Sequence, residues 1–584
     1  MNVTLPLLLT DFYKQVHAEQ YNPKVTKLVS YFTPRMSRLN GEDRLICFGL
    51  QAFCKEYLID YFNKNFFDRP EEEVLTEYNR VLTYSFGKGA YKDEKVRALH
   101  QLGYLPLEIK AISEGSRVPM KVPMIEISNT HPDFAWVTNV IESLMSASLW
   151  HTMLSANVGY KYRKIVNRWY DKTASLSATP SKALGDFSFR GQHSLESAVK
   201  SSAAFCLSFL NTATVPTIPW LEKNYNCDCT KEPVAYGAIS TEHSVMCSNY
   251  AIDGDERIFV KKLLTEIYPD KSFSMVSDSY DYWNMVTEII PSLKEEVMNH
   301  NGTLLVRGDS GDPVDILCGD IRVLDIDPKG TMSWACARTI AEGLLIDKVT
   351  YDGEHTMFPP CEATLYFKYR NEIYKASGTP EWDTDYSAPN WYFDGWEDVK
   401  FEKYELSSEN KGTVELLWET FGGTVNEKGY KVLDSHIKAI YGDSITPQRC
   451  EEIYKRLEEK GFSSENVVLG VGSFSFMCLE ENKTFKPYTR DTFSVAVKTT
   501  YGEYEGKGFE IFKNPKTDNG KFKKSQKGLC RVYEENGELT YEDELNPETI
   551  KGKENLLQPV FINGNMVKEY TLREVRDKLH GGNF

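Results

Sequence analysis

Residues 436–473 read HIKAIYGDSITPQRCEEIYKRLEEKGFSSENVVLGVGS, and this stretch indicates how the chain folds. The apolar segment His436–Tyr441 is typical of a buried strand and is followed by a polar loop. Thr446 followed by Pro447 is typical of a helix start, because threonine caps the first turn and proline suits the first helical position. Four apolar residues fall on one face of this helix, namely Cys450, Ile453, Tyr454 and Leu457, and a glycine ends it before Val467–Gly470 begins a second strand. The stretch therefore predicts a βαβ unit.

Two further apolar segments end in polar turns in the same way. Thr303–Arg307 runs into Gly308–Gly311, and Phe273–Ser277 runs into Asp278. Parallel strands whose carboxyl ends carry chemically active residues resemble the catalytic face of a β/α barrel. We therefore expect an α/β fold with an irregular, barrel-like catalytic domain.

The length of 584 residues suits two or three domains. A stretch rich in aromatic and charged residues interrupts the alternation of strands and helices, and it is typical of an inserted β-rich module. We expect an N-terminal α/β region at 1–150, the catalytic domain at 151–344 and 413–500, the inserted module at 345–412, and a C-terminal region at 501–584.

Composition excludes several classes of protein. With 68 Lys and Arg against 84 Asp and Glu, the formal charge is −16, which argues against a general binder of nucleic acid or of anionic membranes. Pro6 breaks the first apolar run and Asp11 ends it, so we expect no signal peptide and no membrane span. The 12 scattered cysteines are typical of reduced thiols, and we expect a cytoplasmic protein.

The turns after the strands have the residue types of a phosphate and metal site. Arg307 can contact phosphate oxygens through its guanidinium, and glycines beside it let backbone N–H groups approach an anion. The carboxylates of Asp309 and Asp443 can hold Mg²⁺ or a ribose diol. Gly472 follows a strand in a further glycine-containing turn. Each turn alone also fits an ordinary tight turn, and together they favour a phosphorylated ligand.

Other residues suit a planar base and a polyphosphate. Phe187 can stack on a heterocycle, and Arg190 follows it by three residues. Arg490 and Lys498 begin a region of positive charge in an acidic chain, which favours capture of a polyphosphate. His243 lies among polar residues, where it can act as an acid, a base or a phosphate acceptor.

Taken in order, these motifs resemble the nicotinamide phosphoribosyltransferase family over nearly the whole chain. The matching segments are Leu8–Lys14, Gly185–Gly191, Glu242–Ser244, Val276–Asp281, Arg307–Gly311, Gly442–Asp443 and Thr489–Asp491. The resemblance implies a type II phosphoribosyltransferase architecture, with an α/β domain built from both ends of the chain. It implies a homodimer with shared active sites that converts nicotinamide and 5-phosphoribosyl-1-pyrophosphate to nicotinamide mononucleotide and pyrophosphate.

The resemblance also implies how the base is bound. Phe187 stacks on one face of the pyridine, and Tyr13 of the neighbouring subunit covers the other face, with Asp11 at the same edge. Arg307 contacts the carboxamide and the pyrophosphate. In the family the position of Ala213 usually carries an aspartate that accepts a hydrogen bond from the carboxamide nitrogen.

For the donor, the resemblance implies that Asp309 and Asp443 hold the ribose hydroxyls and, through pyrophosphate and water, the Mg²⁺ ion. ATP can phosphorylate His243, with Asp278 nearby, and so couple ATP hydrolysis to synthesis. Asp278, His243, Arg307 and Asp309 are thus the expected catalytic residues. The expected donor and phosphate ligands are Arg190, Gly442, Asp443, Gly472, Ser473, Arg490, Lys498 and Lys523.

Departures from the family pattern keep alternatives open. Ala213 removes an acceptor that favours nicotinamide over nicotinate, so a nicotinate phosphoribosyltransferase is one alternative. Ser473, Ala496 and the insert at Glu480–Lys486 alter the donor end. These changes permit a larger donor, ADP-ribose carrying a 1-pyrophosphate, which would give NAD directly. A catalytically silent pyridine-nucleotide sensor is the alternative from another class, and the retained Arg307 and Asp309 argue against it.

Overall fold

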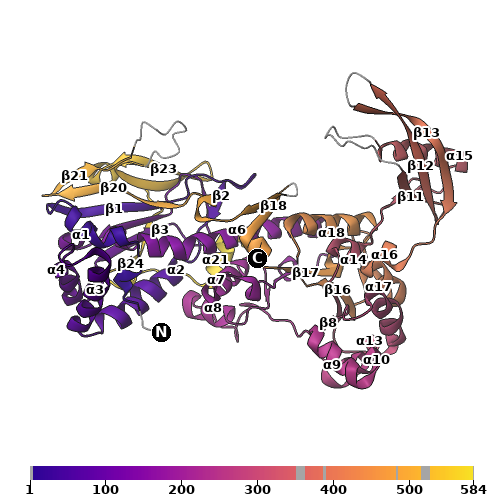
Figure 1. Ribbon diagram of the computed structural model, residues 1–584, viewed down its shortest axis with the longest axis horizontal. Coiled ribbons are helices and arrows are strands. Elements are labelled where there is room, and N and C mark those ends of the chain that lie inside the picture. Colours follow the sequence, from indigo (N-terminus) through magenta and orange to yellow (C-terminus); the bar gives the residue numbers. More distant parts are fainter. Residues whose placement is uncertain are drawn as a thin grey trace. The chain divides into compact units, whose positions relative to one another are not determined.

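The computed structural model describes residues 4–349, 362–385, 390–442, 444–481, 484–513, 526–582 and 584. The chain forms two compact units, each built from separate stretches of sequence (Figure 1). The first unit consists of residues 1–168, 179–238 and 470–584, and the second of 169–178 and 239–469.

The first unit is built around a mixed-origin antiparallel sheet. Its strand order is β21-β20-β1-β5-β3-β24-β25, so three N-terminal strands lie in the middle and C-terminal strands flank them on both sides (Figure 1). The strands are β1 Val25–Thr33, β3 Leu107–Ala111, β5 Ile125–Asn129, β20 Ala496–Tyr504, β21 Lys507–Glu510, β24 Gln558–Ile562 and β25 Asn565–Met566. Every side chain of β5 is buried, as expected for a central strand covered on both faces. The expectation of an α/β domain made from both chain ends is confirmed.

Helices and short parallel strands complete the first unit. The long helix α6, Glu142–Thr173, follows the short helix α5, Val137–Val140, and belongs to this unit up to Arg168. The strands β6 Leu184–Asp186 and β7 Asn211–Thr212 pair in parallel. The C-terminal helix α21, Leu572–His580, begins with a capping box in which Thr571 and Glu574 each bond the other's backbone N–H.

The second unit contains a parallel sheet with the order β8-β9-β16-β17. Helix α18 connects β16 to β17, and the side chain of Thr446 accepts a hydrogen bond of 3.3 Å from the backbone N–H of Arg449 at the helix start. The βαβ prediction for residues 436–473 is confirmed, because the buried face of α18 consists of the four predicted apolar residues, Cys450, Ile453, Tyr454 and Leu457. The strands are β8 Phe273–Val276, β9 Leu304–Gly308, β16 Ile437–Tyr441 and β17 Val467–Val471, and α18 is Pro447–Glu459.

A β-rich module is inserted in the second unit. Four strands in the order β10-β11-β12-β13 pack with helix α15, Trp334–Ile346. The strands are β10 Val323–Asp325, β11 Ala363–Tyr369, β12 Glu372–Asp385 and β13 Asn390–Lys403. Aromatic side chains fill its core: the Trp334 ring centroid lies 4.5 Å from that of Tyr374 and 6.2 Å from that of Phe367. A β-rich insert was expected from the sequence, and its residue boundaries stay a prediction.

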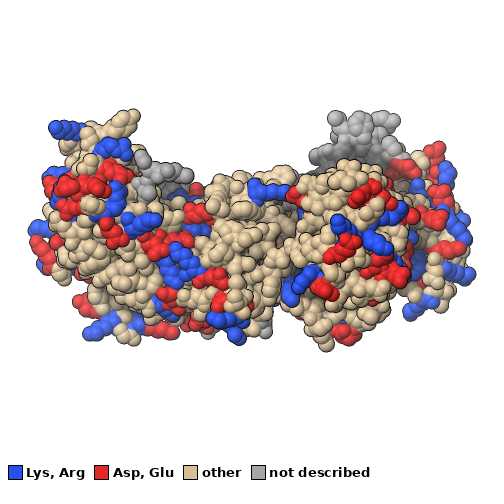
Figure 2. Space-filling view, turned by 90° about the horizontal axis from the view of Figure 1, so that it is seen from below, with Lys and Arg blue, Asp and Glu red and all other residues tan. Residues whose placement is uncertain are grey.

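Within the described ranges, no helix has the length and apolarity needed to cross a membrane. Figure 2 shows Lys and Arg side chains interspersed with Asp and Glu over one face, so the net charge of −16 is spread and does not gather in one acidic patch there. Local electrostatics at the candidate site therefore follow from individual neighbours more than from the average charge.

Candidate active site

Three neighbouring strands of the second unit deliver polar residues to one edge of the parallel sheet. Asp278 follows β8, Arg307 lies on β9 with Asp309 just after it, and Gly442 follows β16. Because these strands are parallel and paired, their carboxyl ends meet at the same edge. The structure thus brings these predicted residues together, and we call them, with His243, the carboxylate–arginine cluster.

Asp278 joins two parts of this cluster. One carboxylate oxygen, Oδ1, lies 3.2 Å from Nε2 of His243, and the other, Oδ2, accepts a hydrogen bond of 3.0 Å from the backbone N–H of Asp309. The Asp278 side chain is 5 % exposed, whereas that of His243 is 48 % exposed. A buried carboxylate therefore orients an accessible imidazole at the first residue of helix α9, His243–Asp253.

Arg307 is held between Asp309 and the next strand. A terminal guanidinium nitrogen donates to Oδ1 of Asp309 at 3.1 Å, and both side chains are largely buried. A Cβ atom on Gly442 would lie 2.3 Å from Nε of Arg307, so the guanidinium packs directly on the backbone of that glycine. The Tyr441 hydroxyl donates to the carbonyl of Gly311 at 2.9 Å and ties the two turns together.

Negative charge gathers beside this arginine. Burial, followed by the carboxylates of Asp309, Asp278 and Asp312, raises the pKa of Tyr441 well above its ordinary range. Carboxylate oxygens are the ligands that Mg²⁺ prefers, usually together with water and substrate phosphates. Among the described residues no three His, Cys, Asp or Glu side chains come together as a metal-binding group. Asp443, the second predicted metal residue, lies outside the described residues.

In the first unit, Phe187 follows strand β6 and is half-buried next to the turn that carries Ala213. The link between them is Asp186, which is fully buried. Its carboxylate accepts hydrogen bonds from the Ser188 backbone N–H at 2.9 Å and from the hydroxyls of Thr212 at 3.1 Å and Thr214 at 3.0 Å. The backbone N–H of Ala213 donates to the Asp186 carbonyl at 2.8 Å, and Ala213 itself is exposed.

The glycine-containing turn packs against the Phe187 segment. The Phe187 backbone N–H donates to the carbonyl of Val471 at 2.9 Å. A Cβ atom on Gly191 would lie 2.1 Å from Oγ of Ser473, so the two turns touch and a larger residue at Gly191 would require Ser473 to move. Arg190 lies in one of these two turns, the exposed turn Phe189–Gly191.

The predicted phosphate ligands Arg490 and Lys498 belong to a larger group of positive charges in the first unit. Burial lowers the pKa of Lys498. The negative charge of Glu142 raises this pKa, whereas the positive charges of Arg35, Lys14 and Arg490 lower it further. We call these four basic residues the cation cluster. Lys523, which sequence reasoning also assigned to phosphate, lies outside the described residues.

Tyr13 and Asp11 lie on the surface of the same unit. The Tyr13 side chain is 59 % exposed, and its hydroxyl donates to Oδ2 of Asp11 at 3.4 Å. Burial, with the negative charges of Asp11 and Glu142, raises the pKa of Tyr13, whereas Arg490 lowers it. Tyr13 therefore lies within electrostatic reach of the cation cluster.

Asp186, Arg35 and Glu142 were not predicted from the sequence. Asp186 lies in the family-matching segment Gly185–Gly191. The only sequence signal for it is an acidic residue at the end of an apolar strand, with hydroxyl residues at 212 and 214. Arg35 and Glu142 lie far in sequence from the motif residues that they face, so no local pattern marks them.

Comparisons with known proteins show which family models and relatives the chain resembles. Residues 183–546 match the family model of the nicotinate phosphoribosyltransferase family, and residues 6–109 match that of the nicotinamide phosphoribosyltransferase N-terminal domain. The nicotinamide phosphoribosyltransferase of Acinetobacter baylyi is 34% identical over 585 residues, which cover 98% of this chain and 97% of that protein. The protein of the same name from Xanthomonas campestris pv. campestris is 26% identical over 98% of this chain and 97% of its own length.

A solved structure is similar in fold. The nicotinate-nucleotide pyrophosphorylase from Pyrococcus furiosus superposes with a TM-score of 0.50 at 13% sequence identity, over 98% of this chain and 94% of that one. At that identity the similarity concerns the fold alone, and it agrees with the expected barrel-like α/β architecture.

Proposed function

Because the chain belongs to the nicotinate phosphoribosyltransferase family, we propose its function from that premise and from the residues of the two clusters. The chain is a pentosyltransferase that transfers the phosphoribosyl group of 5-phosphoribosyl-1-pyrophosphate to nicotinamide. The products are nicotinamide mononucleotide and pyrophosphate, and the reaction serves NAD salvage. The alternatives with nicotinate or with an ADP-ribosyl donor are not favoured. The reason is that relatives which match this chain over most of its length are named nicotinamide phosphoribosyltransferase.

The observation that carries this function is the carboxylate–arginine cluster at the strand ends. Transfer breaks the bond between the anomeric carbon and the pyrophosphate oxygen, which leaves with the electron pair, and forms a bond from that carbon to the pyridine nitrogen. The nitrogen is already a nucleophile, so no base has to remove a proton. Arg307 and Asp309 suit this chemistry: one neutralises the departing anion and the other orients the ribose.

We propose Mg²⁺ as the cofactor. Asp309 and Asp443, which match the metal-binding positions of the family, would hold it through pyrophosphate and water. The carboxylates beside Arg307 supply the oxygen ligands that Mg²⁺ prefers. When bound, the ion supplies positive charge that stabilises the leaving pyrophosphate. The other proposed donor ligands are Arg190, Gly442, Gly472, Ser473, Arg490, Lys498 and Lys523.

We further propose that Phe187 stacks on the pyridine and that Tyr13 of the partner subunit covers its other face, in a homodimer. Ala213 offers no carboxylate to the carboxamide, and the nearby acid Asp186 is buried and fully engaged by three donors. Recognition of the amide would therefore rest on Arg307 and on the partner's Asp11.

ATP coupling through His243 is a separate proposal. Asp278 holds the imidazole in place while leaving it 48 % exposed, which suits a residue that accepts a phosphoryl group. Labelled ATP should transfer its γ-phosphate to the wild-type protein and not to His243→Ala. Equal labelling of both proteins would remove His243 from this role.

We also propose the cytoplasm as the place of the reaction. All eleven cysteines in the described part of the chain are free, and most are buried, which suits a reducing compartment.

The function is tested by product analysis. Purified protein with Mg²⁺ is given nicotinamide or nicotinate, together with 5-phosphoribosyl-1-pyrophosphate or ADP-ribose 1-pyrophosphate, and products are followed by mass. We expect nicotinamide mononucleotide to form fastest. Failure to consume either base with either donor would overturn the transferase assignment, and preferential formation of NAD would overturn the choice of donor.

A further inference from the structure

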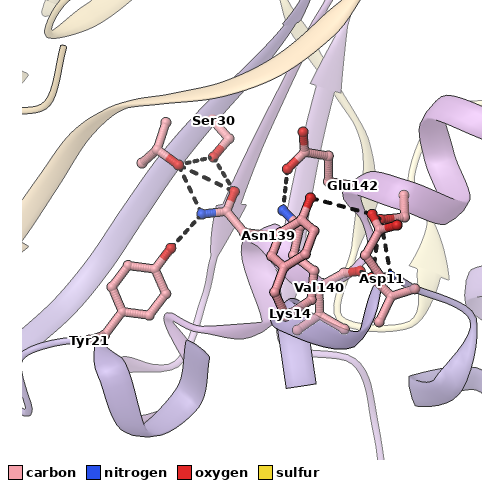
Figure 3. A network of polar contacts seen from close by, with 11 residues as sticks. Asp11, Lys14, Tyr21, Ser30, Asn139, Val140 and Glu142 are labelled. Atoms are coloured by element: carbon pink, nitrogen blue, oxygen red, sulfur yellow. Dashed lines mark hydrogen bonds and ion pairs between the residues drawn. The ribbon is translucent and has the colours of Figure 1, made fainter. Parts of the chain in front are cut away.

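The segment Asn139–Ser143, where helix α6 begins, holds the loop that carries Asp11 and Tyr13 (Figure 3). The Thr10 hydroxyl donates to the carbonyl of Val140 at 2.9 Å. The Asp11 backbone N–H lies 3.4 Å from Oγ of Ser143, and the Ser143 hydroxyl in turn donates to the Asp11 carboxylate. The loop is therefore bound to α6 by backbone and side-chain contacts on both sides of Asp11.

The central contact is an ion pair between Lys14 and Glu142 (Figure 3). The Lys14 side chain is 5 % exposed and that of Glu142 is 22 % exposed, so the pair is largely removed from water. A buried ammonium without its partner is strongly unfavourable, which fixes Lys14 at this position. The Lys14 ammonium also lies 5.6 Å from the ring centroid of Tyr13, its neighbour in sequence.

The same segment reaches the strand that carries Lys498. The Asn139 amide nitrogen donates to the hydroxyls of Tyr21 at 2.8 Å and of Thr499 at 2.9 Å, and its oxygen accepts from Ser30 at 2.9 Å (Figure 3). Thr499 follows Lys498 on β20, and Lys498 is opposite Tyr31 of β1 in the sheet register. One short segment thus connects the loop with Tyr13 to the strand with Lys498.

We propose that Glu142 is a positioning residue of the transfer reaction: it holds Lys14, and with it the loop that carries Asp11 and Tyr13, in a fixed place relative to the phosphate-binding Lys498. The inference rests on the proposed function, in which Tyr13 covers the base in the partner subunit's site, and it places Lys498 of the same subunit at the donor in that same site. Glu142 touches neither substrate in this scheme and acts through the residues that it fixes.

Charge gives Glu142 a second effect. The ionic groups that face Lys498 are Glu142 from α6, Arg35 after β1, Lys14 from the turn Phe12–Val16, and Arg490 from the turn Arg490–Thr492. Glu142 is the negative member of this set. Its removal leaves the lysine among positive charges alone, so Lys498 loses its proton at a lower pH and binds a phosphate less well on the alkaline side.

The test uses Glu142→Gln in the full-length protein, which keeps the shape and the acceptor for Lys14 but removes the charge. We expect KM for nicotinamide to rise about tenfold or more, as for loss of a contact worth about 1.4 kcal/mol. We also expect the alkaline limb of kcat/KM for 5-phosphoribosyl-1-pyrophosphate to move to lower pH by about half a unit. Glu569→Gln is the matched control, since Glu569 pairs with Lys55 at 2.5 Å in the same unit, outside the clusters.

A double variant separates positioning from folding. Lys14→Met with Glu142→Gln removes both buried charges, so no unpaired ammonium is left to disturb the fold. We expect a folded protein in which KM for nicotinamide stays raised. The alkaline limb of kcat/KM for 5-phosphoribosyl-1-pyrophosphate should return toward its wild-type position, because Lys498 has lost one positive and one negative neighbour. The inference would be overturned if Glu142→Gln had the wild-type KM for nicotinamide and an unshifted alkaline limb of kcat/KM. A wild-type KM for nicotinamide in the double variant would also overturn it. If wild-type protein forms no nicotinamide mononucleotide, it is the proposed function that fails.

Discussion

At Gly442, the missing side chain is what leaves room for Arg307. Because a Cβ atom would meet Nε of Arg307 at 2.3 Å, the glycine sets how far the guanidinium can extend along the strand ends. The obstacle is a flexible side chain and not backbone, so substitution should displace the arginine without unfolding the unit. The position therefore separates catalysis from stability.

Gly442→Ala is expected to lower kcat/KM for 5-phosphoribosyl-1-pyrophosphate at least about tenfold while changing the melting temperature little. Gly343→Ala is the control, because Gly343 lies in α15 and, apart from its chain neighbours and the backbone of its own helix, no atom lies within 4 Å of the added carbon. The measurement is steady-state kinetics with thermal melting of both variants. Full activity in Gly442→Ala would show that the position of Arg307 does not matter to turnover.

Asp309→Ala is expected to reduce turnover about 100-fold or more, because it removes both the partner of Arg307 and a proposed metal and ribose ligand. Its fold should persist, since the Asp309 contact with Asp278 is made by backbone. Asp270→Ala, at an exposed position of the same unit, is the control. Activity of Asp309→Ala equal to that of this control would remove Asp309 from the site.

How far the sequence predicts the site is decided residue by residue. Asp278, Arg307 and Asp309 were predictable because each lies at or just after the end of a recognisable strand, and parallel strands put their ends together. Asp186 was not, because its role depends on two hydroxyls delivered by another strand. Glu142 could not be found either, since its partner Lys14 is 128 positions away and no local pattern connects them.

At the scale of elements, local signals worked where a helix and its strands follow one another in sequence. Helix α18 has its predicted cap and buried face because both depend on residues within a few turns. The antiparallel sheet of the first unit was less accessible: pairing of β1 with β20 joins residues more than 400 positions apart, and periodicity does not specify a partner.

The C-terminal helix α21 carries an element-scale prediction about acid stability. Burial, with the nearby guanidinium of Arg163, lowers the pKa of His580 from 6.5 to about 4, and its Nε2 lies 3.0 Å from the Leu207 carbonyl. Between these pH values the unfolded chain binds a proton that the folded chain does not, so stability falls as the pH drops from 6.5 toward 4. The full effect is at most about 3 kcal/mol.

His580→Gln keeps a donor for that carbonyl and cannot take up the proton. Its melting temperature should therefore fall less between pH 7 and pH 4.5 than that of the wild type, by differential scanning calorimetry. His131→Gln, at a side chain 37 % exposed, should follow the wild-type curve. Identical acid dependence in His580→Gln and wild type would contradict the assignment.

At the scale of the whole molecule, the proposed homodimer predicts complementation between two inactive proteins. Asp309→Ala has an intact Tyr13, and Tyr13→Ala has an intact Asp309. If each site takes Tyr13 from the partner subunit, a mixed dimer has one complete site, and a randomised mixture should recover about a quarter of wild-type activity. The measurement is activity after the two proteins are denatured together and refolded, against each refolded alone. No recovery in a mixture shown to contain mixed dimers would mean that Tyr13 serves its own subunit.

The sheet of the first unit, whose N-terminal strands are flanked by C-terminal strands, has a consequence for synthesis on the ribosome. Strands β1, β5 and β3 can pair with one another early, but the outer edges of β1 and β3 pair with β20 and β24, which begin only at Ala496 and Gln558, so these two edges wait for their partners through most of translation. At roughly 5–20 residues per second that delay lasts tens of seconds. The stretch 239–469 is completed in the meantime and can fold first. The nascent N-terminal region therefore exposes unpaired strand edges during elongation, and the growing chain should be a client of chaperones that bind at the ribosome exit.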